Sequence, residues 1–185
     1  MTEETFKDAM HRMEKAVEGI KSELAKLRTG KASPALVDNI QVQYYGSTVP
    51  LKQLGNISAP EPRLIVIQPW DKSIMNEIEK AILKADLGLN PSNDGIAIRI
   101  PIPTLTEERR KELVKVVKKL GEEGKIAIRN IRRDANEKLK NGEKEHKISE
   151  DDLHRFQENI QELTNDYTKK IDAILVSKEK EIMEI

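Results

Sequence analysis

Apolar residues recur along the first 29 residues at alternating spacings of four and three, and this repeat limits the possible folds more than any other feature of the sequence. An average spacing of 3.5 residues is that of a coiled-coil seam, the narrow apolar stripe along which long helices pack. The repeat predicts one long helix over residues 1–29, with Gly30 as its stop. The members of this seam are Phe6, Met10, Met13, Val17, Ile20, Leu24 and Leu27.

Two later segments carry a similar repeat and predict two further long helices. Residues 104–141 begin with a capping box, Thr104 with Glu107, and end at Asn141-Gly142, while Ser149 can cap a third helix that runs almost to residue 185. Helices of ~35 residues reach ~50 Å, and a seam of that length must be buried. The simplest solution within one chain is a three-helix bundle. The seams comprise Leu113, Val117, Leu120, Ala127, Ile131 and Ala135, and then Leu153, Phe156, Ile160, Leu163, Tyr167, Ile171 and Ile174.

The segment between the first two helices has a different character, because it holds all eight prolines of the chain. Residues 40–44 alternate like a half-buried strand, residues 64–67 form the short apolar run of a more buried strand, and residues 96–100 give a third strand. Ser73 can cap a helix that runs to about Ala85. We expect Trp70 to be a core residue, and of Tyr44 and Tyr45 we expect one to be buried and the other exposed.

This organisation predicts an α+β protein in two domains. Residues 1–30 and 104–185 would form the long three-helix bundle, and residues 31–103 a small inserted β/α/β domain. The insertion is joined to the bundle by two chain segments, one at Gly30-Lys31 and one at Pro103-Thr104. Two such connections can act as a hinge, or the small domain can pack rigidly on the end of the bundle. Glycine and proline occur at most of the boundaries, so the sequence supports both arrangements equally.

The composition excludes several classes of function. The chain has no cysteine, so it lacks thiolate nucleophiles and cysteine-bound zinc, and its aromatic content of 3% is too low for a stacking platform that binds single strands. It contains no phosphate-binding loop, no His-Glu-x-x-His and no Gly-x-Ser-x-Gly motif. His11, His146 and His154 are too scattered to hold a metal ion. We expect neither an enzyme nor a protein that needs a metal or a cofactor.

The same figures favour a folded protein of the cytoplasm. Charged residues make up 35% of the chain, but 32 basic and 32 acidic side chains give a net charge of zero, whereas disorder usually requires a high net charge. No apolar run reaches the ~18 residues that a membrane span requires. The N-terminus has neither the basic start nor the apolar stretch of a signal peptide.

The zero net charge conceals an uneven distribution. Residues 104–141 hold 12 basic and 7 acidic side chains, whereas residues 142–185 hold 7 and 12. When the second helix is projected at about 100° per residue, most of its basic residues fall opposite its seam. This cationic stripe comprises Lys111, Lys115, Lys118, Lys125, Arg129, Arg132, Arg133 and Lys140.

A solvated helix face is the more common explanation for a run of charge. Three features favour a functional one here: the stripe is continuous, almost free of acids, and rich in arginine over residues 129–133. The planar guanidinium suits bidentate contacts to phosphate. We expect the stripe not to pair with the acidic third helix, which would pack on the other side. It would instead follow an RNA backbone in a salt-dependent manner, through Lys118, Lys125, Arg129, Arg132 and Arg133.

Short motifs along the chain also carry a family resemblance. They occupy residues 27–35 (Leu-Arg-Thr-Gly-Lys-Ala-Ser-Pro-Ala), 44–46 (Tyr-Tyr-Gly), 69–71 (Pro-Trp-Asp), 78–82, 86–91, 105–110 and 122–133. Each motif is weak alone, but their order and spacing together are specific. In these motifs, and over essentially its whole length, the chain resembles the bacterial ribosome recycling factors. Residues 140–150 carry no distinctive motif.

The resemblance implies an L-shaped pair of domains joined by a two-strand hinge, and a monomeric factor that acts after termination of translation. The bundle would bind the large ribosomal subunit and its rRNA. Elongation factor G would hydrolyse GTP and drive the bundle so that the subunits part and messenger RNA and deacylated transfer RNA leave. The small domain would face elongation factor G, and neither DNA nor a membrane is a partner. The resemblance places Arg28, Arg129 and Arg132 in the RNA-contacting region and makes Gly30, Lys31, Pro103 and Thr104 hinge candidates.

An alternative from another class is a coiled-coil scaffold or chaperone-like protein whose seams bind helices of its partners. The two hypotheses place the binding surface differently. A ribosome-binding factor would use the cationic stripe, whereas a scaffold would leave an apolar seam exposed in the monomer.

Overall fold

The computed structural model describes residues 1–184, which form two compact units. One unit consists of residues 1–28 and 107–184, and the other of residues 29–106. The first unit is entirely helical and the second contains all the β-strands of the described chain. The predicted fold class, α+β with a long three-helix bundle and a small inserted domain, is confirmed.

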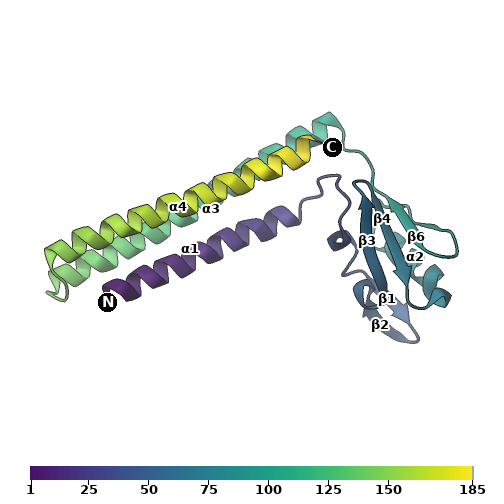
Figure 1. The fold of residues 1–185 in the computed structure, drawn as a ribbon, viewed down its shortest axis with the longest axis horizontal. Helices are drawn as coiled ribbons and strands as arrows, with labels where there is room; N and C mark the ends of the chain where they lie inside the picture. Colours follow the sequence, from purple (N-terminus) through teal and green to yellow (C-terminus); the bar gives the residue numbers. More distant parts are fainter. Residues whose placement is uncertain (185) are drawn as a thin grey trace. The chain divides into compact units, whose positions relative to one another are not determined.

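Three helices form the bundle, and Figure 1 shows them running alongside one another. They are α1 (Thr2–Ala25), α3 (Glu107–Lys144) and α4 (Glu150–Met183). The seams meet in a core in which Met13, Ile128 and Ile160 are fully buried. Their burial supplies the main stabilisation of the bundle, since a fully buried side chain of this size contributes roughly 1.5–3 kcal/mol.

The helix ends differ in part from those predicted. The cap of α4 is confirmed, because the Asp152 N–H donates to Ser149 Oγ over 3.0 Å. The predicted end at Asn141-Gly142 is wrong: α3 continues to Lys144, with Gly142 buried against the Met1 side chain. The capping box at Thr104 is also wrong, since α3 begins at Glu107. The first helix ends at Ala25, not at residue 29.

The first seam also differs from the prediction at Met10. Met10 is 41% exposed, whereas its neighbour Ala9 is buried against the bundle core. Ala9, Met13 and Val17 follow one another at intervals of four residues. The buried face of α1 is therefore rotated slightly from the seam predicted from the larger apolar side chains.

The small unit contains two antiparallel sheets and one helix (Figure 1). The first sheet is a hairpin of β1 (Gln41–Tyr44) and β2 (Ser47–Pro50), and the second has the order β3-β4-β6-β5. Its strands are β3 (Gly55–Glu61), β4 (Leu64–Pro69), β5 (Ser92–Asn93) and β6 (Ile98–Pro101). Helix α2 (Met75–Lys84) packs against β1. Single 3₁₀ turns occupy Pro34–Leu36, Leu51–Gln53 and Lys72–Ile74.

Local residue chemistry explains the hairpin between β1 and β2. Tyr45 and Gly46 have φ values of 47° and 82°. Positive φ at both central residues is what a two-residue hairpin turn requires for its twist to match that of the strands. The turn leaves Tyr45 77% exposed, while Tyr44 packs against the core of the small unit. The expected exposure of one tyrosine is confirmed at Tyr45, whereas Tyr44 is half-buried against the core rather than fully within it.

The expectation that Trp70 is a core residue is wrong, because its side chain is 73% exposed. Side chains alternate across a strand, and the buried Pro69 at the end of β4 places Trp70 on the outer side. The core is filled instead by aliphatic side chains, of which Ile65, Ile67, Ile78 and Ile98 are fully buried.

None of the described helices combines the length and the apolar character that crossing a membrane demands.

Candidate functional site

The exposed side of α3 carries a shallow hollow of about 560 Å³ that gathers part of the cationic stripe. Three predicted RNA-binding residues line it, Arg129, Arg132 and Arg133, together with Lys140. Arg129 and Arg133 are exposed, so their guanidinium groups are available to a ligand. The remaining lining residues are Asn130, Asn136, Glu137 and Gln161.

Arg132 differs from the other two arginines because a neighbouring helix holds it. It is half-buried, and its Nη1 donates to Gln161 Oε1 on α4 over 3.1 Å. Gln161 Nε2 in turn donates to Asn165 Oδ1 over 2.9 Å. This chain of hydrogen bonds fixes the direction of one guanidinium edge, which lowers the entropy lost when the group contacts a phosphate.

A polar atom beside these arginines lacks a partner within the described chain. Asn136 Oδ1 is buried, and none of the described groups donates a hydrogen bond to it. Asn136 lines the same hollow as the arginines. A buried acceptor without a donor is unfavourable, so a donor brought by water or by a ligand would stabilise this edge of the hollow.

Lys125 does not behave as the stripe predicted. Its Nζ lies 2.6 Å from Asp172 Oδ1 on α4, and its side chain is only 21% exposed. The hydrogen bond to Asp172 raises the pKa of Lys125 above its usual value. The expectation that no member of the stripe pairs with the third helix is therefore wrong at Lys125. At this position on α3 the four-carbon stem bends back far enough to reach α4.

The other predicted RNA-binding residues lie outside the hollow. Lys118 is an exposed residue of α3, and Arg28 follows the C-terminal end of α1 in the helical unit. Neither lines the hollow. The structure thus brings Arg129, Arg132 and Arg133 together around the hollow, whereas Arg28, Lys118 and Lys125 do not line it.

The four hinge candidates lie in the chain segments that connect the two units. Gly30 has a φ of 77°, a backbone conformation that favours glycine. Thr104 Oγ1 accepts a hydrogen bond from Arg63 Nη1 over 3.1 Å, so it is tied to the small unit rather than capping α3. Lys31 and Pro103 are exposed.

Two ion pairs at the surface of the bundle join α3 to α1. Arg12 Nη2 lies 2.9 Å from Asp134 Oδ2, and this hydrogen bond lowers the pKa of the Asp134 carboxyl. Lys138 Nζ lies 3.4 Å from Asp8 Oδ2 on α1. Asp134 therefore links α3 to α1 at the position next to Arg133. The roles of Asp134 and Gln161 could not be predicted from the sequence, because each depends on which residue of another helix lies opposite, and that of Asn136 depends on its burial.

A hydrogen bond between α1 and α4 leads to a prediction about stability and pH. Tyr167 is buried, and its hydroxyl donates to Glu14 Oε2 over 2.7 Å. Burial, reinforced by the neighbouring Glu14 carboxylate, raises the pKa of Tyr167 to about 12. We expect Tyr167→Phe to lower the free energy of unfolding by about 1 kcal/mol at neutral pH.

The advantage of the wild type should shrink at high pH. The pKa of the unfolded tyrosine is near 10, below the value of about 12 in the folded protein. Raising the pH between these two values therefore stabilises the unfolded wild-type chain. The phenylalanine variant has no such group, so its stability is not affected in this way. Urea unfolding of both proteins at about pH 8 and pH 11 checks this. An equal difference at both values would show that Tyr167 titrates normally.

Comparison with known proteins identifies the family. The family model described as "Ribosome recycling factor" matches residues 20–183. The ribosome-recycling factors of Syntrophomonas wolfei and Halalkalibacterium halodurans are each 57% identical over 185 residues, covering the whole of both chains in each comparison. A solution structure of the ribosome recycling factor has a TM-score of 0.77 at 49% identity and covers 100% of this chain and 98% of its own.

A second solved structure places a relative on the ribosome. It is described as models for the T. thermophilus ribosome recycling factor and the E. coli elongation factor G bound to the E. coli post-termination complex. Its matching chain has a TM-score of 0.66 at 48% identity, and 99% of each chain is covered. A family model that spans most of the residues and relatives that match from end to end agree, and the chain belongs to the ribosome recycling factor family.

Proposed function

We propose that this protein binds the post-termination ribosome and, with elongation factor G and GTP, separates it into subunits so that messenger RNA and deacylated transfer RNA are released. The observation that carries the proposal is the end-to-end similarity to ribosome-recycling factors. It is supported by a relative bound with elongation factor G to the post-termination complex. Ribosomes work in the cytoplasm, and the protein would act there as a monomer.

The helical unit would supply the contact with the large subunit and its rRNA. Arg129 and Arg133 offer exposed guanidinium groups, and Arg132 is held beside them by Gln161. Phosphate oxygens are suited to such a group of planar donors. We assign Arg28, Lys118 and Lys125 to the periphery of the contact, with Lys125 available only if its ion pair with Asp172 opens.

The small unit would face elongation factor G, and the segments around Gly30-Lys31 and Pro103-Thr104 would allow it to move. Gly30 supports this role, because its positive φ lets the chain turn where a larger residue would be strained. The protein needs no catalytic group of its own, since GTP hydrolysis by its partner supplies the free energy. A long bundle with a continuous core is suited to transmit force.

The alternative, a scaffold that binds partner helices through its seams, is disfavoured because the bundle itself buries most of the seam residues among the described residues. Met13, Val17, Ile128, Ile160 and Ile171 are buried within the bundle. A scaffold of that kind would present such residues to solvent in the monomer.

Light scattering of purified post-termination ribosomes tests the proposal directly. We expect the scattered intensity to fall when this protein, elongation factor G and GTP are all present, and to stay constant when any one of them is omitted. Ribosomes that stay associated in the complete mixture would contradict the proposed function.

Binding to the large subunit should depend steeply on salt. Each phosphate that an arginine neutralises releases counterions and contributes roughly −0.7 to −0.9 to the slope of log K against log salt. Three arginines therefore predict a slope of about −2 to −3. Co-sedimentation at several salt concentrations measures it, and the double variant Arg129→Gln with Arg133→Gln should flatten the slope by about 1 to 2. A slope near zero for the wild type would exclude phosphate contacts.

A further inference from the structure

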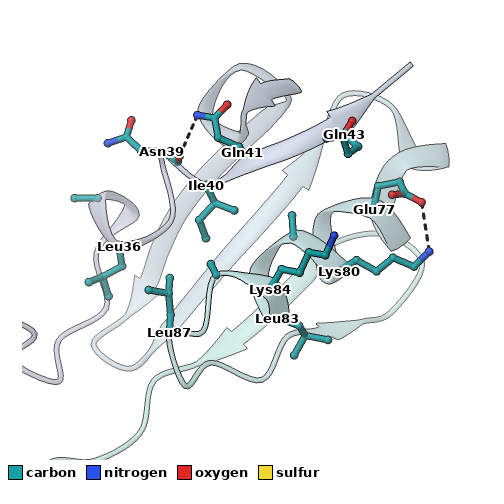
Figure 2. Close-up of a pocket in the computed structure, with 13 residues that line it drawn as sticks. Leu36, Asn39, Ile40, Gln41, Gln43, Glu77, Lys80, Leu83, Lys84 and Leu87 are labelled. Carbon is teal, nitrogen blue, oxygen red and sulfur yellow. Dashed lines mark hydrogen bonds and ion pairs between the residues drawn. The ribbon is translucent and has the colours of Figure 1, made fainter. Parts of the chain in front are cut away.

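The small unit contains a groove of about 890 Å³ that the proposed function does not use (Figure 2). One wall is formed by Asn39 and Ile40, which precede β1, and by Gln41 and Gln43 of that strand, and the other wall is formed by α2. Leu36 and Leu87 come from the loops on either side. The α2 residues that line it are Glu77, Lys80, Ala81, Leu83 and Lys84.

The wall formed by β1 is the unpaired edge of a sheet. Within the part of the chain that the structure describes, β1 pairs only with β2. Gln41 lies opposite Pro50, which has no N–H, and the Leu51 N–H donates to the Ile40 carbonyl over 2.8 Å. Backbone groups alternate in direction along an antiparallel pair. Ile40, Val42 and Tyr44 therefore bond to β2, and the backbone N–H and C=O groups of Gln41 and Gln43 point away from it.

This edge lacks the proline, the irregular register and the two-residue length that occur on the other outer strands. Sheet edges are usually protected by proline, charge, bulges or short length. Strand β2 ends in Pro50, β3 contains Pro60 and an irregular register between Ser58 and Glu61, and β5 has two residues. Strand β1 has the sequence Gln-Val-Gln-Tyr, without proline, charge or a register shift.

The side chains around this edge indicate what would lie on it. Leu36, Ile40, Ala81 and Leu87 provide an apolar surface. Figure 2 shows Ile40 and Leu87 directed toward one another across the groove, with the Lys80 and Lys84 side chains along its α2 side. The charges there are two lysines and one glutamate.

The two lysines differ in whether they have a partner. Lys80 Nζ lies 3.5 Å from Glu77 Oε1, whereas the described residues give Lys84 no ion pair. Lys84 therefore leaves a positive charge beside the strand edge. An acidic ligand would complement this charge.

We propose that the groove binds an extended, acidic segment of a partner protein, which adds to the outer edge of β1 as a further strand. The backbone of Gln41 and Gln43 would supply two N–H donors and two C=O acceptors. Alternate apolar side chains of the segment would contact Leu36 and Leu87, and a carboxylate would pair with Lys84. Such strand addition derives its affinity from main-chain hydrogen bonds and its specificity from alternate side chains.

The proposal is independent of rRNA binding, because the groove and the arginine hollow belong to different units. It is tested on the full-length ¹⁵N-labelled protein by NMR. The probe is a nine-residue peptide of alternating valine and glutamate with blocked ends. We expect it to shift the Gln41 and Gln43 amide resonances in the millimolar range and to slow their hydrogen exchange.

Two matched controls separate strand addition from other modes of binding. The same peptide with N-methyl groups along one edge keeps its side chains but loses the donors on that edge, and it should bind at least tenfold more weakly. Lys84→Glu should weaken binding of the unmodified peptide by a similar factor. Lys72→Glu, at an exposed lysine of the small unit outside the groove, should leave it unchanged.

Several outcomes would overturn the proposal. Equal binding of the N-methylated peptide would show apolar contact without strand addition. Shifts at Gln41 and Gln43 that grow with protein concentration alone would show pairing between two copies of this chain. Shifts of the Gln41 and Gln43 resonances with an oligouridine, but not with the peptide, would identify an RNA-binding site instead. Absence of any shift would exclude the site. Gln43→Pro removes one outward N–H, so it should abolish binding of the peptide by strand addition.

Discussion

Arg132→Glu should weaken binding to the large ribosomal subunit by roughly 100-fold while the unfolding midpoint of the bundle changes little. The expected loss corresponds to about 2–3 kcal/mol, the contribution of a hydrogen bond to a charged group, with added repulsion from the new carboxylate. Arg132 is the arginine whose direction is fixed, through Gln161 Oε1 at 3.1 Å. Reversing its charge therefore removes the most ordered donor of the hollow.

The stability of the variant should be almost unaffected because Arg132 is only half-buried and contacts a neutral amide. Co-sedimentation with separated large subunits measures binding, and circular dichroism measures unfolding. Lys169→Glu is the matched control: it reverses an exposed charge on α4 that does not line the hollow, and it should leave binding intact. Wild-type affinity in Arg132→Glu, or an equal loss in Lys169→Glu, would show that the hollow is not the contact.

Gln161→Leu separates the two roles assigned to Arg132. The substitution removes the acceptor that orients the guanidinium but keeps its charge. Binding should weaken by only a few-fold, and its dependence on salt should remain. A few-fold loss of affinity with an unchanged salt dependence would show that charge and orientation contribute separately to the same contact.

The apolar repeat was sufficient to predict the bundle because each seam residue is buried by the same geometry at every turn. The repeat could not place Met10 and Ala9, since the turn of a helix about its own axis depends on how closely its neighbours approach. The strand β3 escaped prediction for a related reason. Its sequence, Gly-Asn-Ile-Ser-Ala-Pro-Glu, has little apolar alternation, and it is held as a strand by pairing with the strongly apolar β4.

The candidate site shows the same limit. The sequence of one helix predicts which of its residues share a face, but their contacts depend on the neighbouring helices. Periodicity alone put Arg129, Arg132 and Arg133 on one side of α3, and the structure places all three around one hollow. Lys125 belongs to the same stripe by projection, yet its ammonium reaches Asp172 on α4. A helical projection gives the direction of Cβ and not the reach of a long side chain. For this reason the edges of a charged surface are harder to predict than its centre.

The glycines of α3 lead to the largest expected effect on stability. Gly124 costs about 1 kcal/mol of helix propensity relative to alanine, which makes it an unfavourable choice for the middle of a long helix. The packing explains its presence: a Cβ at this position would lie 2.8 Å from Ile20 Cγ1 on α1 and 3.3 Å from Ile171 Cδ1 on α4. Gly124 therefore lets three helices meet closely where a side chain would separate them.

We expect Gly124→Leu to lower the free energy of unfolding of the bundle by at least about 2 kcal/mol, since overpacking typically costs about 1–3 kcal/mol. The unfolding midpoint should fall by roughly 10 °C. Gly19→Leu is the matched control, because Gly19 is also a helical glycine but a Cβ there meets no atom within 4 Å. The free energy of unfolding of Gly19→Leu should rise by up to about 1 kcal/mol, because leucine has a higher helix propensity than glycine. Thermal unfolding followed at the helical band of the circular dichroism spectrum compares the two.

Opposite signs for the same substitution at two helical glycines would assign the effect to packing rather than to propensity. If Gly124→Leu instead raised the midpoint as Gly19→Leu does, the helices would have to separate at no cost. The bundle could then not be the stiff body that force transmission to the ribosome requires. The outcome therefore tests both the packing at the centre of the bundle and the mechanical role proposed for it.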